Sequence, residues 1–320
     1  MTLRTLGPTE LRVSPLCLGG NVFGWTADEA ASFAVLDAYV AGGGNFIDTA
    51  EVYSRWVPGH QGGESETILG RWLQARKHRD RVVIATKVGS AMGEAPDQKG
   101  LSRKRILDAV DGSLRRLQTD VIDLYQAHFD DPETPLEETL ATFDELIKAG
   151  KVRHIGASNY TAPRLKGALD TAQRLGLRPY ETMQPGYNLL DREEFEGPLQ
   201  ALCQERGLGV LTYYGLASGF LSGKYRKDRP LPSSSRAARV QQTYMNERGF
   251  RVLDALDAIA SQHHATDSQV ALAWVMAQPG VTCAIASATS VVQVEDLLGS
   301  MRLQLDAESL GRLTEAGKPD

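Results

Sequence analysis

The sequence predicts an α/β protein built as a (β/α)8 barrel, with a hairpin before the first strand and a long loop after the seventh. Short apolar runs rich in β-branched residues alternate with longer stretches of helical periodicity. Eight runs of this kind occur, and about eight parallel strands close such a barrel. The 320 residues give about 40 per strand–helix unit, an ordinary size for a barrel with insertions. We therefore expect residues 1–320 to form one domain.

The predicted strands are short, and recognisable helix starts lie between them. The strands cover residues 16–18, 45–48, 82–87, 122–127, 154–157, 182–184, 210–213 and 282–286. Ser102 is expected to cap one helix, and Pro135 fits the first position of another. Three pairs match the capping box, in which two side chains satisfy free backbone amides: Thr26 with Glu29, Thr134 with Glu137, and Thr266 with Gln269.

A doubly wound open sheet is the alternative fold. That fold usually carries a G-x-G-x-x-G turn directly after its first strand. Here the chain reads GGNVFG at 19–24, which lacks this spacing, and no phosphate-binding P-loop motif occurs. The barrel is therefore favoured.

Two segments do not fit the repeating unit. Residues 3–15 contain a hairpin signal around Gly7-Pro8, and this hairpin is expected to plug one end of the barrel. Residues 226–248 are polar, basic and serine-rich, without periodicity. Loops of this length are usually functional or disordered. We interpret the segment as a flap over a ligand, with a plain surface insertion as the alternative.

Composition narrows the function classes. The 35 basic and 40 acidic residues give a net charge of −5, which favours neither nucleic acid nor an anionic membrane as a partner. No apolar run approaches the ~20 residues that span a bilayer, and the first residues lack a secretory pattern. The protein is therefore expected in the cytoplasm, with its oligomeric state open. The three cysteines, Cys17, Cys203 and Cys283, are interpreted as buried free thiols.

Polar side chains end six of the predicted strands. In a (β/α)8 barrel, catalytic groups project from the carboxyl ends of the strands. Taken singly, each such residue fits a solvated strand end, but together they predict a site on one rim of the barrel. The residues are Asp48, Lys87, His128, Ser158 with Asn159, Gln184 and Tyr213.

Asp48, Tyr53, Lys87 and His128 suit a reaction in which an oxygen receives a proton while electrons arrive at its carbon. A phenol has an ordinary pKa near 10, so we expect the Lys87 ammonium to lower the pKa of Tyr53. Asp48 would hold Lys87 in place, and His128 would donate a hydrogen bond to a carbonyl oxygen. No spacing matches a metal site and no G-x-S-x-G marks a nucleophile. An organic cofactor is therefore expected to supply the electrons.

The chain resembles the aldo-keto reductases over nearly its whole length. The segments that carry the likeness are LRVSPLCLG at 11–19, FIDTA at 46–50 with Tyr53, GESE at 63–66, TK at 86–87, GKVR at 150–153, IGASN at 155–159 and ASGFLSGKY at 217–225. The resemblance implies a (β/α)8 barrel that reduces aldehydes and ketones, sugar-derived carbonyls included, with NADPH. NADH remains an open alternative.

The resemblance also implies residue roles. Tyr53 would be the general acid, Lys87 and Asp48 its tuning partners, and His128 the group that orients the carbonyl. The implied cofactor-binding residues are Gly20, Ser158, Asn159, Gln184, Tyr213, Gly215, Leu216, Ser218, Ser287, Thr289, Gln293 and Asp296. Trp25, Trp56 and Phe129 are plausible walls for the substrate, and Trp56 fits a packing role equally well.

Some positions depart from the family's pattern. Tyr214-Gly215 replaces a common Ser-Pro, and no Lys or Arg follows the last strand to hold a ribose 2′-phosphate. Asp296 stands for a usual Glu, and Leu297 for a usual Asn. Arg236 or Arg239 of the long loop is a candidate for the missing charge.

Two other functions stay open at this point. The first is a cofactor-sensing binding or regulatory subunit with little turnover, as in the β subunits of potassium channels. The second is an aldolase that uses Lys87 as a Schiff base. That amine must be neutral to attack, and Asp48 opposes this.

Overall fold

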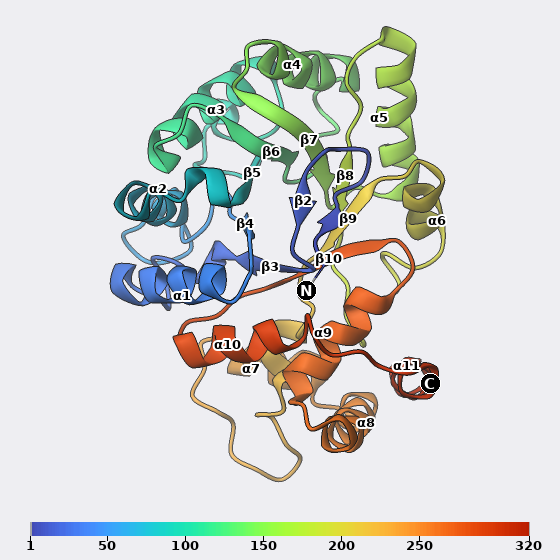
Figure 1. The fold of residues 1–320 in the computed structure, drawn as a ribbon. Coiled ribbons are helices and arrows are strands. Elements are labelled where there is room, and N and C mark those ends of the chain that lie inside the picture. The colour runs from blue at the N-terminus through green and yellow to red at the C-terminus, as the bar shows by residue number, and fades with distance from the viewer. Residues whose placement is uncertain (1, 320) are drawn as a thin grey trace.

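Eight parallel strands form a closed barrel, which confirms the predicted fold class (Figure 1). The computed structural model describes residues 2–319, apart from the side chain of Pro96. The barrel strands are β3 (Leu16–Gly19), β4 (Phe46–Asp48), β5 (Val83–Val88), β6 (Ile122–Ala127), β7 (Val152–Ser158), β8 (Thr182–Gln184), β9 (Gly209–Thr212) and β10 (Val281–Ala286). β10 pairs with β3 and closes the ring. All eight predicted strands are present, with ends shifted by two residues or fewer.

Helices cover the outside of the barrel (Figure 1). They are α1 (Glu29–Ala41), α2 (Glu64–Arg76), α3 (Arg103–Leu117), α4 (Leu136–Lys148), α5 (Ala162–Leu175), α6 (Pro198–Glu205), α7 (Ala237–Tyr244), α8 (Glu247–His263), α9 (Asp267–Ala277), α10 (Val291–Gly299) and α11 (Ala307–Ala316). In α3, Ile106, Ala109, Val110 and Leu117 are buried. This spacing puts one apolar stripe against the strands, so the main core lies between helices and barrel.

The N-terminal hairpin plugs the amino end of the barrel, as predicted. It consists of β1 (Arg4–Thr5) and β2 (Arg12–Val13). Leu6, Leu11 and Val13 are buried in one cluster with side chains from inside the barrel, Cys17 and Cys283 included. All three cysteines are free and buried, which confirms their interpretation.

Gly7 lets the turn of this hairpin approach the strands. Its φ is +56°, a left-handed conformation that favours glycine. A Cβ at this position would lie 2.3 Å from the backbone nitrogen of Gly209, at the start of β9. The hairpin therefore seats on the barrel only with glycine here.

Two of the predicted helix starts are right and two are wrong. Thr266 forms the capping box with Gln269, and Ser102 caps α3. α1 is capped instead by Asp28, whose Oδ1 accepts from the amide of Ala31 at 2.8 Å, so Thr26 forms no cap.

The predicted box at Thr134 is absent because the hydroxyl has another acceptor. Thr134 Oγ1 donates to Asp131 Oδ2 at 2.7 Å, which fixes the preceding loop. Pro135 occupies the cap position itself, one residue before its predicted place.

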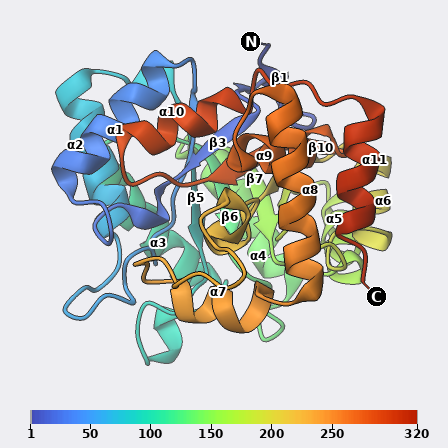
Figure 2. The same cartoon turned by 90° about the horizontal axis from the view of Figure 1, so that it is seen from below.

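The prediction of an irregular loop over 226–248 is wrong in its second half. That part contains α7, and α8 begins at Glu247; Figure 2 shows α7 leading into α8. Val240 and Tyr244 lie one turn apart and are both buried. Two anchoring residues in a polar stretch are too few for a recognisable helical pattern.

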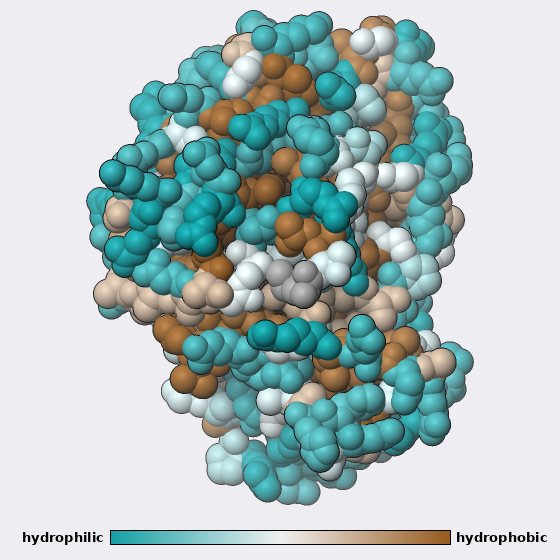
Figure 3. Space-filling view, in the orientation of Figure 1, coloured by the Kyte–Doolittle hydropathy of each residue, from teal (hydrophilic) through white to brown (hydrophobic). Residues whose placement is uncertain are grey.

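The view in Figure 3 shows mostly hydrophilic residues, with small hydrophobic areas between them. No helix within residues 2–319 has the length and apolar character that crossing a membrane requires.

Candidate active site

Lys87 lies at the centre of a hydrogen-bonded group at the carboxyl ends of β4 and β5. Its Nζ lies 2.6 Å from Asp48 Oδ2, 2.8 Å from Tyr53 Oη and 3.0 Å from the carbonyl oxygen of Thr49. The Lys87 and Asp48 side chains are 0% and 2% exposed. The structure therefore brings together three of the four residues that the sequence analysis grouped.

The pKa of Tyr53 moves in the direction opposite to the one expected from the sequence. Burial, and then the negative charge of Asp48, raise the pKa of Tyr53 well above its ordinary value. Burial lowers the pKa of Lys87, although Asp48 opposes this change. The expectation was wrong because it considered the charge of the Lys87 ammonium and left out the removal of the Tyr53 phenol from water. Tyr53 is thus held as a neutral phenol, the form that a proton donor requires.

His128 completes this group. Its ring centroid lies 6.1 Å from that of Tyr53, with the rings edge to face. Burial, together with the charge of Lys87, lowers the pKa of His128 well below its ordinary value, so the imidazole is neutral. Nδ1 lies 2.9 Å from Ser90 Oγ. When that hydroxyl donates, the imidazole proton resides on Nε2, the nitrogen free to donate. Sequence reasoning missed Ser90, which lies two residues beyond the end of β5.

The residues predicted to hold a carboxamide join the same network. Gln184 Nε2 donates to Asp48 Oδ1 at 2.9 Å, which leaves Gln184 Oε1 as an acceptor. Ser158 Oγ donates to the carbonyl of Gln184 at 2.9 Å, and Asn159 Nδ2 donates to the carbonyl of His128 at 2.8 Å. Tyr213 Oη donates to Asn159 Oδ1 at 2.6 Å. Amide and hydroxyl side chains thus lie beside the group formed by Asp48, Tyr53 and Lys87.

The segment after β9 has an irregular backbone with several left-handed residues. Tyr214, Ala217 and Ser218 all have positive φ, and Gly219 follows with φ +93°. Gly215 and Ser218 are buried and Leu216 is partly buried. The amides of Ala217 and Gly219 donate to the carbonyls of Tyr214 and Leu216, so the segment forms a tight turn of its own.

The segment after β10 offers hydroxyl groups at the start of α10. Ser287 Oγ bonds to Asn21 Oδ1, and the amide and hydroxyl of Thr289 both donate to Gln293 Oε1. Ser290 caps the helix. Loops after the last two strands, together with a short helix start, often bind phosphate in barrels of this type.

Gly20 and Asp296 have structural partners. The carbonyl of Gly20 accepts from Ser65 Oγ at 2.7 Å. Asp296 Oδ1 accepts from Thr266 Oγ1 at 2.8 Å and from Gln269 Nε2 at 3.0 Å. The Asp296 carboxylate therefore stabilises the start of α9, which sequence reasoning did not anticipate.

A sequence model of the aldo/keto reductase family matches residues 15–318. The chain belongs to this family. It is 35% identical to the uncharacterized oxidoreductase YrpG of Bacillus subtilis (strain 168), over 97% of this chain and 94% of the relative. Protein tas of Escherichia coli (strain K12) is also 35% identical, over 95% and 94%. A probable voltage-gated potassium channel subunit beta of Oryza sativa subsp. japonica is 36% identical, over 92% and 89%.

This aldo/keto reductase is therefore an oxidoreductase, of a family that typically uses nicotinamide cofactors.

Within residues 2–319, no group of three or more His, Cys, Asp or Glu side chains could hold a metal ion.

Aromatic rings line one side of the candidate site. Trp25 and Trp56 meet edge to face with centroids 5.5 Å apart, and Trp56 lies 6.2 Å from Tyr53. Phe129 stacks on His128 at 4.9 Å. Trp56 is 49% exposed and Phe129 is 50% exposed. Trp56 is therefore not a core residue, and the three predicted wall residues lie around the phenol and the imidazole.

Three cations near the mouth of the site have no carboxylate partner in the described part of the chain. The Arg236 guanidinium lies 5.5 Å from the centre of the Trp25 ring, and that of Arg239 lies 5.4 Å from the Tyr214 ring. Burial, and then the positive charge of the nearby Arg236, lower the pKa of Lys224. Unpaired positive charges at close quarters favour an anionic ligand.

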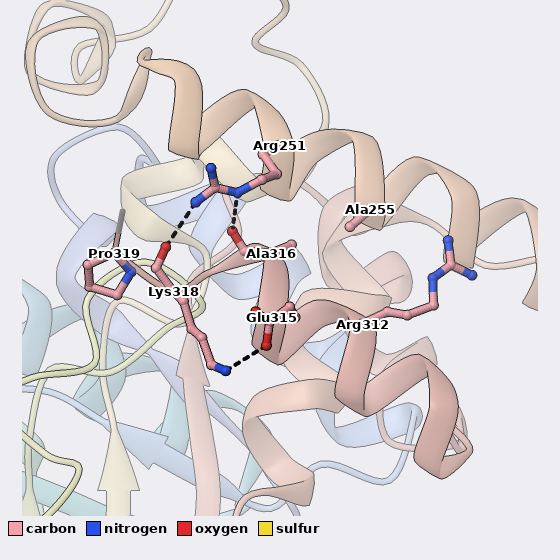
Figure 4. Close-up of a pocket in the computed structure, with 7 residues that line it drawn as sticks. All are labelled: Arg251, Ala255, Arg312, Glu315, Ala316, Lys318 and Pro319. Atoms are coloured by element: carbon pink, nitrogen blue, oxygen red, sulfur yellow. Dashed lines mark hydrogen bonds and ion pairs between the residues drawn. The ribbon is translucent and has the colours of Figure 1, made fainter.

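One cavity lies on another part of the molecule. It measures about 500 Å³, lies between α8 and α11 and is lined by Arg251, Arg312, Glu315 and Lys318 among others (Figure 4). Arg251 Nε donates to the carbonyl of Ala316 at 3.1 Å, and Lys318 pairs with Glu315 at 2.6 Å. Arg251, Glu315 and Lys318 therefore already have partners within this cavity.

Proposed function

We propose that this protein reduces small aldehydes and ketones, sugar-derived carbonyls among them, to alcohols with NADPH. The observation that carries the proposal is the position of the buried Lys87 Nζ, 2.8 Å from the Tyr53 phenol and 2.6 Å from the buried Asp48 carboxylate. A bound nicotinamide would supply a hydride to the carbonyl carbon. Tyr53 gives its proton to the carbonyl oxygen, and the neutral His128 donates a hydrogen bond that orients this oxygen.

The cofactor residues fit a dinucleotide by their donor set. Gln184 Oε1 and the Ser158–Asn159 side chains suit a carboxamide, and Tyr213 is partly exposed beside them. The backbone amides of Gly215, Leu216 and Ser218 suit a pyrophosphate, while that of Ala217 donates to the carbonyl of Tyr214. The hydroxyls of Ser287 and Thr289 suit a ribose or its phosphate. Because the Asp296 carboxylate is already bonded to Thr266 and Gln269 at the start of α9, we assign it no cofactor contact.

We further propose that Arg236, with Lys224 and Arg239, supplies the positive charge that is missing after β10. Burial lowers the pKa of Arg236, so its charge gains from an anionic partner. Arg236→Gln should therefore weaken NADPH binding and leave NADH binding almost unchanged. Equal losses for both cofactors would assign the charge to the pyrophosphate instead.

The proposal is tested by fluorescence titration with NADPH and NADH, followed by turnover with aldoses and simple aromatic aldehydes. Tyr53→Phe should keep cofactor affinity within about twofold and lower kcat by ~10²–10⁴-fold, the usual contribution of general acid catalysis. Full activity in this variant would show that the phenol is not the acid.

The alternative function is a cofactor-binding regulatory subunit with little turnover. The observation in favour of this alternative is the 36% identity to the rice protein named as a probable voltage-gated potassium channel subunit beta. Tight NADPH binding, a stable complex with a second protein and negligible turnover on every carbonyl tried would support this alternative. A Schiff-base aldolase is disfavoured because Lys87 is buried and paired with Asp48.

A further inference from the structure

A second buried ion pair joins the loops that follow β4 and β5, next to the candidate site. Glu51 and Arg105 are 2% and 6% exposed, and the Arg105 guanidinium donates to Glu51 Oε1. The same oxygen accepts from the amide of Gly89 at 3.3 Å. Glu51 belongs to the turn after β4, while Arg105 lies in the first turn of α3. One carboxylate oxygen therefore joins three segments of the chain.

These segments carry the groups that face the proposed substrate. Tyr53 lies two residues after Glu51. Ser90, whose hydroxyl contacts His128 Nδ1, directly follows Gly89. A second tie joins the same two loops, since Arg55 Nε donates to the carbonyl of Met92 at 3.0 Å.

The charge of this pair calls for an explanation. Removing two charges from water carries a large free-energy cost, and a well-packed apolar pair often stabilises a fold as well or better. Apolar side chains, however, could not accept hydrogen bonds from the Gly89 amide and the Arg105 guanidinium, whereas the single oxygen Glu51 Oε1 accepts both. What the ion pair adds is a fixed separation between the two loops.

We propose that Glu51 and Arg105 are positioning residues that set the placement of the Tyr53 phenol relative to the His128 imidazole, and through it the rate of carbonyl reduction. The kinetic part of this inference rests on the proposed function. The geometric part does not.

Substitutions at the pair should change kcat rather than binding. In Glu51→Gln and in Arg105→Met, kcat should fall by about 10–100-fold, because a displacement near 1 Å can cost 10²-fold in rate. KM and the NADPH dissociation constant should stay within about twofold. The double variant should be no slower than the slower single variant, because both changes break one interaction. Arg105→Lys, which keeps the charge, should recover part of the rate and serves as the test if Glu51→Gln does not fold.

Asp123 and Arg79 provide a matched control at the other end of the barrel. Arg79 Nη1 lies 2.9 Å from Asp123 Oδ2, which also accepts from the amide of Ile84 at 2.9 Å. Asp123 is 3% exposed, so the two buried carboxylates have the same kinds of partner. Asp123→Asn should lower stability and leave kcat unchanged.

A second readout separates this inference from the proposed function. The ¹⁵N shifts of the His128 ring should change in Glu51→Gln and not in Asp123→Asn, because only the first change loosens the Ser90 contact. If the wild type reduces no carbonyl, the proposed function fails and the ring shifts still decide the inference. Unchanged His128 shifts, or equal kcat in Glu51→Gln and Asp123→Asn, would overturn it.

Discussion

The two ends of the barrel each hold a histidine among charged groups and change its pKa in opposite directions. At the carboxyl end, burial and Lys87 lower the pKa of His128. At the amino end, burial also acts to lower the pKa of His154, but hydrogen bonds to Glu181 and Glu10 outweigh it and raise the pKa. Glu10 comes from the hairpin that plugs this end.

This difference indicates that the two ends of the barrel have different roles. At the amino end, both His154 contacts hold the fold together: Nδ1 lies 2.9 Å from Glu181 Oε2, and Nε2 lies 3.1 Å from Glu10 Oε2. His128 instead keeps one ring nitrogen available beside Tyr53. Substitutions at the carboxyl end should therefore change chemistry, and those at the amino end should change stability alone.

The largest effect on activity and stability together is expected for Lys87→Met. Removing the ammonium leaves the Asp48 carboxylate buried without its ion-pair partner, which should cost about 3–5 kcal/mol of unfolding free energy. Turnover should fall by at least about 10²-fold, because the Tyr53 hydroxyl loses the ammonium that donates to it and keeps only its hydrogen bond to Asp48 Oδ2. Urea unfolding and steady-state kinetics measure both losses.

The control for this substitution is Lys151→Met. Lys151 Nζ lies 2.6 Å from Asp111 Oδ1 in an exposed pair just before β7. Its loss should cost at most ~1 kcal/mol, with kcat unchanged. Equal destabilisation by the two substitutions would show that the Lys87 pair is not a special feature of the site.

At the amino end, Gly7→Ala tests the plug. The added Cβ would collide with the backbone of Gly209 and force a left-handed alanine, so the variant should lose ~1–3 kcal/mol of stability. The kcat measured well below its melting temperature should match the wild type. A fall in kcat without loss of stability would show that the plug takes part in the chemistry.

The smallest effect is the pH dependence of the two histidines. His154 has a raised folded pKa, so its contribution to stability is complete below about pH 6.5 and is lost as pH rises through the folded value. His128 has a lowered folded pKa, so stability falls as pH drops below about 6.5, where the unfolded chain takes up the proton. The melting temperature of His154→Gln should therefore approach that of the wild type at high pH. A difference that grows with pH would contradict this.

Local patterns made most of the fold predictable. The apolar runs gave the eight strands, and the polar residues ending them gave Asp48, Lys87 and Gln184. Thr26 and Asp28 are both good helix caps, so the sequence could not decide between them. The helix in 237–244 was missed because only Val240 and Tyr244 anchor it.

The rest of the site depends on contacts between distant residues. Glu51 and Arg105 lie 54 positions apart, and no spacing rule connects them. The direction of the Tyr53 pKa depends on how much water the fold removes, which the list of neighbouring charges does not give. The contact between Ser90 and His128 could be recognised only from the fold, in which β5 and β6 bring the two residues together.

The central claim is that the carboxyl-end group supports hydride transfer to a carbonyl. The most direct test incubates the protein with an aromatic aldehyde and NADPH deuterated at the transferable position of the nicotinamide, followed by mass spectrometry of the product. We predict an alcohol carrying one deuterium on the former carbonyl carbon, formed by the wild type and nearly absent with Tyr53→Phe. Tight NADPH binding with no deuterated alcohol from any aldehyde or ketone would contradict the claim.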